Sequence, residues 1–201
     1  GSPTMSITSS GAVSISGTVN APSAVGAKGV TGSGGSVSAT GSGTVTITGS
    51  GVPAPAPATS YAVDLSGTTV SSAGGLVKFV GDRINLASNV NSGTGRTMFV
   101  PFSTNRSITL AGPSDINALN LSSTELNLVT ASTIVVGGSS YTGGIAIGNT
   151  GGNISPTNAS ALSLINQSAI TQTAPVTVSS LNADTSSGTG AVTLTNTSNA
   201  I

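Results

Sequence analysis

The sequence predicts an all-β fold made of many short strands. Of its 201 residues, 35 are Ser and 29 are Thr, and a further 28 are Gly and 15 are Asn, so few residues favour helix. Apolar and hydroxylic residues alternate in short runs, which places Val, Ile and Leu on one face of a strand and Ser or Thr on the other. The clearest runs are 12–16, 44–48, 76–80, 107–110, 144–148, 161–165, 176–178 and 191–195.

A loose internal repeat favours stacked coils. Residues 11–16, 43–48 and 190–195 share the order Gly, small residue, Val, hydroxyl residue, Ile or Leu, hydroxyl residue. Self-similar strands separated by turns indicate coils that bury their apolar faces on one another. The chain has only two Tyr and three Phe, fewer than a sandwich core typically uses. We predict a parallel β-helix of irregular coils with loop excursions, about eight to ten coils of roughly 20 to 25 residues. A β-sandwich is the alternative.

One segment interrupts the pattern. Residues 53–57 alternate Pro and Ala, a sequence that cannot sit inside a sheet ladder and that prefers an extended polyproline conformation. Similar strand runs on both sides favour a loop over a domain linker. We therefore divide the chain into N-terminal coils at 1–50, a Pro-rich loop or linker at 51–60, and further coils at 61–201. The opening Gly1-Ser2 is typical of a cloning remnant, so we expect a longer parent protein.

Composition argues against several classes of function. Five basic and five acidic residues give no net charge, so there is no electrostatic case for binding nucleic acid or anionic lipid. The absence of His and Cys removes the common catalytic triads, thiolate nucleophiles and His-based metal sites. No run approaches the roughly 18 apolar residues of a membrane helix. We predict no enzyme, no cofactor, no metal and no membrane insertion.

Glu125 is the only glutamate, and it lies among leucines in a region of Ser, Thr and Ala. A carboxylate in this setting can be a catalytic acid or a structural group. The nearest carboxylate in the sequence, Asp115, is ten residues away, so no catalytic partner is evident. We predict that Glu125 accepts backbone N–H bonds at a coil corner. Its neighbours Leu121, Leu126 and Leu128 are candidate core residues.

Four residues are candidate surface contacts. Thr44, Thr46 and Thr48 would project from one side of a strand, and a Thr row on a flat face can order water, as in ice-binding proteins. Tyr141 lies in the Gly-rich segment 137–144, where an exposed ring could stack on a sugar. The plainer interpretations are an ordinary Thr-rich outer face and a loop ring that packs over the coil below.

The second half of the chain carries a recognisable succession of segments: Arg106–Gly112, Leu121–Leu128, Val129–Gly137, Gly144–Gly148, Ser168–Thr173 and Gly190–Thr195. This succession resembles the repeat region of large bacterial surface proteins of the filamentous haemagglutinin type, which are exported by two-partner secretion or related routes. In that family a Ser/Thr-x-Glu-Leu stretch, an Ala, an Ile/Val-Gly and a Gln-Thr-containing strand follow in this order. The resemblance covers about residues 60 to 201, and residues 1–50 match only in style.

The resemblance implies a right-handed β-helical shaft and no catalytic residues. The family's secretion-signal domain is not evident, so internal shaft is expected. The resulting hypothesis is a structural and adhesive segment of a secreted bacterial surface fibre, located at the cell surface or outside the cell. We expect self-association, end-to-end or edge-wise, through unpaired strand edges, and contact with host or environmental glycans or surfaces. The alternatives are a carbohydrate-active or carbohydrate-binding β-helix protein and an ice-binding module.

Overall fold

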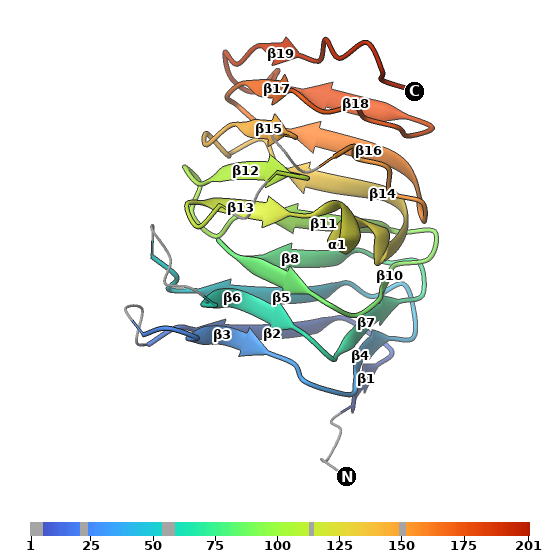
Figure 1. Ribbon diagram of the computed structural model, residues 1–201. Helices are drawn as coiled ribbons and strands as arrows, with labels where there is room; N and C mark the ends of the chain where they lie inside the picture. The colour runs from blue at the N-terminus through green and yellow to red at the C-terminus, as the bar shows by residue number, and fades with distance from the viewer. Residues whose placement is uncertain (1–5, 21–23, 54–58, 113–114, 149–151) are drawn as a thin grey trace.

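The computed structural model describes residues 6–20, 24–53, 59–112, 115–148 and 152–201. Over these ranges the chain is nearly all β, and every strand pairing is parallel. The strands stack in successive coils along one axis, and the chain passes three faces in each full coil (Figure 1). A sandwich of antiparallel sheets is therefore not the architecture. The arrangement is solenoid-like, as the internal repeat predicts.

In each coil the chain passes first along face A, then along face B and then along face C. Face A holds β1 (Ser6–Ser9), β4 (Ser36–Ala39), β7 (Thr69–Ser72), β10 (Val90–Asn91) and the start of β14 (Val129–Gly137). Face B holds β2 (Val13–Thr18), β5 (Val45–Ser50), β8 (Val77–Val80), β11 (Arg96–Val100), the rest of β14, β16 (Ala159–Ile165) and β18 (Leu181–Asp184).

Face C is made of two separate sheets. The first holds β3 (Lys28–Thr31), β6 (Tyr61–Leu65) and β9 (Ile84–Leu86). The second holds, in spatial order, β13 (Ala118–Leu121), β12 (Ser107–Leu110), β15 (Ile145–Ile147), β17 (Ile170–Gln172) and β19 (Val192–Thr193). The short helix α1 (Ser123–Asn127) connects β13 to β14.

Alternation of side chains explains both the strands and the core. In β5 every second residue is buried, and Val45 and Ile47 have no exposed surface. The interior is a column of aliphatic side chains, and its largest members are Phe79 and Phe99. These two rings lie one above the other on β8 and β11, with centroids 5.2 Å apart and planes 12° apart. Phe102, two residues after β11, is 51% exposed and lies outside the core.

The coils are irregular in length, as predicted. On face B, Leu162 pairs with Leu181, 19 residues later, whereas Thr97 pairs with Ile134, 37 residues later. Face B carries seven strands in the described part of the chain, so the prediction of eight to ten coils is too high. The longer of these two coils contains two face C strands, β12 and β13, and the helix α1. Elsewhere turns of different length absorb the variation, because only the inward positions must stay in register.

A column of glycines marks the corner between faces A and B. A Cβ atom added to Gly43 would lie 2.2 Å from the carbonyl oxygen of Gly11 in the coil below. The same atom on Gly75 would lie 2.4 Å from the carbonyl of Gly43, and on Gly95 it would lie 2.2 Å from that of Gly75. These distances are shorter than any van der Waals contact, so the backbones can stack at this corner only without side chains.

The Pro-rich segment connects strands of one continuous stack. Residues 54–58 of that segment lie outside the described ranges. Before it, β5 pairs with β8, and after it β6 pairs with β3, so strands from both sides share the same sheets. Near the C-terminus, the run 176–178 forms two isolated bridges, Ile154 with Val176 and Thr177 with Ala200, instead of the expected strand.

The order of strands on face C reverses once. After β11 the chain forms β12, and then β13, which pairs with the lower edge of β12, while β15 takes the upper edge. Strand β13 thus lies between β9 and β12 in space, although it follows β12 in the sequence. No ladder joins β9 to β13 among the described residues, so face C is interrupted at this level.

Candidate binding site at the break in face C

Glu125 lies at this break and connects its two sides. Ser122 caps α1 by accepting a hydrogen bond from the Glu125 amide (3.2 Å), and Glu125 Oε2 accepts in return from Ser122 N–H (2.9 Å) and its hydroxyl (2.7 Å). This reciprocal pattern is a capping box. The other carboxylate oxygen, Oε1, accepts from the Leu86 amide of β9 at 3.1 Å. Glu125 therefore bridges two elements that no strand pairing connects.

The three leucines near Glu125 fix α1 to the core. Leu121 has no exposed surface and Leu126 is 1% exposed, and both belong to the main hydrophobic cluster. Leu128 is half-buried and packs against that cluster. The segment that contains the lone carboxylate is therefore anchored from below by apolar side chains, which hold the carboxylate at the surface of the break.

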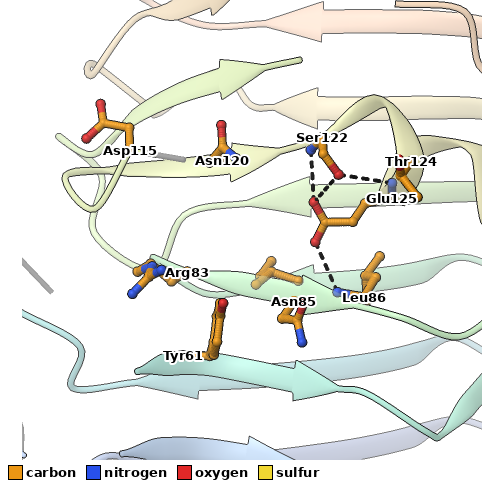
Figure 2. Close-up of a pocket in the computed structure, with 10 residues that line it drawn as sticks. Tyr61, Arg83, Asn85, Leu86, Asp115, Asn120, Ser122, Thr124 and Glu125 are labelled. Atoms are coloured by element: carbon orange, nitrogen blue, oxygen red, sulfur yellow. Dashed lines mark hydrogen bonds between the residues drawn. The ribbon is translucent and has the colours of Figure 1, made fainter. Parts of the chain in front are cut away.

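A pocket of about 280 Å³ opens beside Glu125 (Figure 2). Its walls come from β6 and β9 below, from β13 and the residues before it above, and from α1 at one end. The lining residues are Tyr61, Arg83, Ile84, Asn85, Leu86, Asp115, Asn120, Ser122, Thr124 and Glu125. The pocket exists because the strand ladder is interrupted here.

Tyr61 and Arg83 form one wall. The guanidinium carbon of Arg83 lies over the Tyr61 ring, 4.7 Å from its centroid, a cation–π contact. Nη1 of Arg83 donates to the Ser60 carbonyl at 2.8 Å, and the residue is only 8% exposed. These contacts hold both side chains in one orientation, so this wall is preformed.

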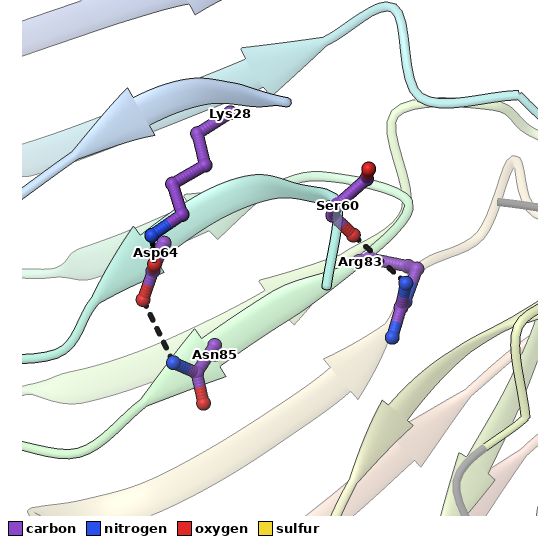
Figure 3. A network of polar contacts seen from close by, with 5 residues as sticks. All are labelled: Lys28, Ser60, Asp64, Arg83 and Asn85. Carbon is purple, nitrogen blue, oxygen red and sulfur yellow. Dashed lines mark hydrogen bonds and ion pairs between the residues drawn. The ribbon is translucent and has the colours of Figure 1, made fainter. Parts of the chain in front are cut away.

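A row of polar side chains across three coils holds Asn85 in place (Figure 3). Lys28 of β3 forms an ion pair with Asp64 of β6, and Asp64 Oδ1 accepts from Nδ2 of Asn85 at 2.7 Å. Asp64 is 2% exposed, so its charge needs both partners. Because Nδ2 of Asn85 is used in this way, its Oδ1 is left to face other groups.

Several polar atoms of the pocket carry no hydrogen bond within the described part of the chain. Asn120 Oδ1 accepts from the Thr109 hydroxyl (2.7 Å), which leaves its Nδ2 available. Asp115 Oδ1 accepts from the Asn117 amide (2.7 Å), which leaves Oδ2. The other available atoms are Oδ1 of Asn85 and the hydroxyls of Thr124 and Tyr61. The pocket therefore offers both donors and acceptors.

A second charged cluster lies nearby but does not line this pocket. Asp82 is 4% exposed and accepts from Ser103 N–H (2.8 Å) and its hydroxyl (2.5 Å). Burial lowers the pKa of Arg106, and the charge of Asp82 opposes that effect. Nη2 of Arg106 donates to the Ile116 carbonyl at 3.1 Å. Asp82 therefore ties Ser103, between β11 and β12, to the coil below, and Arg106 ties the start of β12 to Ile116 before β13.

Tyr141 lies beside this second cluster and outside the pocket. It is half-buried, and its amide donates to the Gly138 carbonyl at 3.1 Å. Burial raises the pKa of the Tyr141 phenol, and the negative charge of Asp82 raises it further. The ring of Tyr141 packs against Gly138, where an added Cβ atom would lie 3.2 Å from it. A fully exposed stacking ring is not what the structure shows.

The three threonines lie on the outer side of face B, on or next to β5, and are half-exposed. The neighbouring strand β8 places Lys78 beside Thr46 and Val80 beside Thr48. The threonine row is therefore not continued across the stack at this position.

Sequence reasoning singled out Glu125 but not the other residues of the pocket. Tyr61, Asn85 and Asn120 come from three strands, Arg83 directly precedes one of them, and no local motif links the four. The one sequence signal is the adjacency of Asp82 and Arg83, two charges in a chain with few. They separate in the structure, since Arg83 lines the pocket and Asp82 belongs to the second cluster.

No group of three or more metal-binding side chains occurs in the described residues. Helix α1 has five residues, and none of the described residues form a helix that is long and apolar enough to cross a membrane. Comparisons with protein-family models, with curated proteins and with solved structures return no match for this chain.

Proposed function

We propose that this chain is a structural segment of a bacterial surface fibre, a right-handed β-helical shaft that gives reach to an adhesive protein outside the cell. The resemblance to filamentous haemagglutinin-type repeats motivates this proposal, and the stacking of parallel strands supports it. The observation that carries it is that strand edges are exposed at both ends of the stack. Within the described ranges, strands β1, β2 and β3 have a partner on one side only, and so do β18 and β19.

The two ends complement each other. The first described coil begins on face A with β1 and continues to β2 and β3. The last one leaves β18 on face B and β19 on face C, and then returns to bridge Thr177 with Ala200. A coil placed on either end would extend each ladder in the same parallel direction. Such head-to-tail contacts do not close on themselves, and they generate filaments.

Apolar side chains at the ends support the same role. Ile7, Ile15 and Val30 of the first coil pack on the core but line a cavity of about 210 Å³ at that end. At the other end Leu181 and Leu194 are likewise only partly buried. A further coil would complete the burial of both sets, as neighbouring coils do inside the stack. In solution the available partner is a second copy of the chain.

Sedimentation tests this proposal. We expect the mean mass of the 201-residue chain to rise with concentration, because end-to-end contacts follow mass action. Ile15→Lys places an inward charge on the free edge and should keep the chain monomeric. Ser14→Lys adds the same charge to the same strand, but at an exposed outer position, and should still associate. Circular dichroism checks that both variants keep their strands.

A strictly monomeric chain at high concentration would contradict the proposal of self-association. If Ser14→Lys blocks association and Ile15→Lys does not, contacts through the sides of the stack replace end-to-end contacts.

A carbohydrate-binding role is the second candidate, and the pocket favours it. Two carboxylates, Asp115 and Glu125, and the cation Arg83 converge on one hollow. Glycoside cleavage would require one carboxyl group to act as an acid on the substrate. Both oxygens of Glu125 accept hydrogen bonds from the chain itself, which commits this residue to holding the break. We infer binding rather than cleavage.

A further inference from the structure

We propose that the pocket at the break in face C binds one uncharged sugar unit of a glycan. This inference rests on the adhesive part of the proposed function and assigns it to a place on the shaft. It does not depend on whether the chain forms filaments, because none of the edge strands β1, β2, β3, β18 and β19 lines the pocket. The elements that line it, β6, β9, β13 and α1, follow one another along the side of the stack (Figure 1).

Size and preorganisation fit a single ring. At about 280 Å³ the pocket lies at the lower limit of ligand pockets, which suits a monosaccharide better than an extended chain. Ligand-binding walls are usually formed before the ligand arrives. Here the Arg83–Tyr61 contact and the Asn85–Asp64 hydrogen bond fix one wall, and the capping box fixes the opposite end. Little side-chain ordering is then needed on binding.

The available polar atoms match the chemistry of hydroxyl groups. A sugar hydroxyl donates one hydrogen bond and accepts others, so its partners must include both kinds of atom. Asn120 Nδ2 is a donor, Asn85 Oδ1 and Asp115 Oδ2 are acceptors, and the hydroxyls of Thr124 and Tyr61 serve as either. All of them lie around one hollow (Figure 2). This mixture suits an uncharged ligand with several hydroxyls.

An extended peptide fits less well. Adding a strand to β9 would require a row of free backbone groups along its edge. The Ala87 amide bonds to β6, so in this parallel ladder Leu86 and Ile84 face the break. The Leu86 amide is already taken by Glu125. Ile84 keeps both its backbone groups directed at the break, and Leu86 keeps only its carbonyl, which is too short a row to hold a strand.

Charged ligands fit less well too. The pocket holds two carboxylates and one guanidinium, so an anionic sugar would meet a net negative charge. A bare cation would find no third carboxylate among the described residues, and calcium prefers six to eight oxygen ligands. The remaining class is a neutral, hydroxyl-rich ring.

An NMR titration of the intact chain tests the inference. The probes are the methyl glycosides of glucose, galactose, mannose and N-acetylglucosamine, at millimolar concentration, where single sugars typically bind. We expect at least one to saturate, with shifts at the side-chain amides of Asn85 and Asn120. Thr124→Ala and Asn120→Ala should each weaken that binding by roughly three- to tenfold, because each removes one hydrogen bond. Thr124 is exposed, so its variant should fold normally.

Asn182→Ala is the matched control. Asn182 is an outward asparagine on face B, and its Nδ2 donates to the Ser163 hydroxyl of the next strand at 3.0 Å. This variant should bind the sugar as the parent does. Failure of every neutral glycoside to saturate would overturn the inference. So would preferential binding of methyl glucuronide or of a short Val/Thr peptide, or equal binding by the pocket variants and the parent.

The same samples separate this inference from the proposed function. If sugar binding is absent while the mass still rises with concentration, the pocket proposal fails and the shaft proposal stands. If sugar binds to a chain that stays monomeric, the shaft proposal loses its support and the pocket proposal stands.

Discussion

At the scale of single residues, Glu125 illustrates what a sequence can and cannot show. Its position after Ser122 has the spacing of a capping box, and the lack of a second carboxylate nearby in the sequence argues for a structural role. The partner on β9 is not visible in the sequence, because Leu86 is 39 residues away. Local chemistry thus predicts that the carboxylate accepts N–H bonds, and only the fold shows what it joins.

Glu125→Gln should lower the free energy of unfolding by about 1–3 kcal/mol. The substituted amide has one oxygen, so its NH₂ group must face either the Leu86 amide or the Ser122 amide, and both are donors. Urea unfolding followed by circular dichroism measures the loss. Asp115→Asn removes a charge from the same pocket but keeps an acceptor for its single partner, Asn117. That control should change stability by less than about 0.5 kcal/mol. Equal losses in the two variants would contradict a specific role for Glu125.

At the scale of elements, the alternating runs predict most strands on face B well, because burial there follows period two. Strand β5 is an example, with alternate residues fully buried. The reversal of β12 and β13 was not predictable. Both segments have the same alternation, and nothing local decides which edge of β12 receives β13 and which receives β15. Which strand pairs with which edge depends on the neighbouring coils, and their lengths cannot be read from the alternation.

The glycine column gives a second test. Gly75→Ala should destabilise the chain by about 1–3 kcal/mol, because the new methyl group would overlap the carbonyls of Gly43 and Ser42 at 2.4 Å. Gly11→Ala is the matched control at the end of the column. Its methyl group would meet only the Ser9 hydroxyl, at 4.0 Å, so stability should stay within about 0.5 kcal/mol of the parent. Thermal melting of both variants decides. Similar melting temperatures would show that the corner can widen.

At the scale of the whole molecule, the all-β class followed from composition and alternation, and the parallel stack from the internal repeat. The number of coils and the binding pocket did not follow from the sequence. The pocket combines Tyr61, Asn85 and Asn120, which meet only because a ladder is missing between β9 and β13. A missing interaction has no sequence signature, since each of the two strands looks complete by itself.

The break in face C also has a mechanical consequence. Faces A and B continue past it without interruption, through the β7–β10–β14 and β8–β11–β14 ladders. A stack whose ladder is interrupted on one face should bend most easily toward or away from that face, because the ladders on the other two faces resist stretching. Double electron–electron resonance can measure this bending as the distribution of distances between two spin labels. The labels can be attached to introduced Cys residues, because the chain has no Cys of its own. Labels at Ser66 and Asn117 span the break, and labels at Ser14 and Ser160 span the uncut face B. We expect the wider distance distribution for the first pair, and equal widths would contradict it.

In a fibre built from such segments, bending would concentrate at each break in face C instead of being spread along the length. Glu125 would resist this bending, because its hydrogen bond to Leu86 must open whenever β9 and β13 move apart. The direction of bending is then set by the face that carries the break. The fibre would have a preferred plane of curvature, and bending at each break would open and close the same pocket.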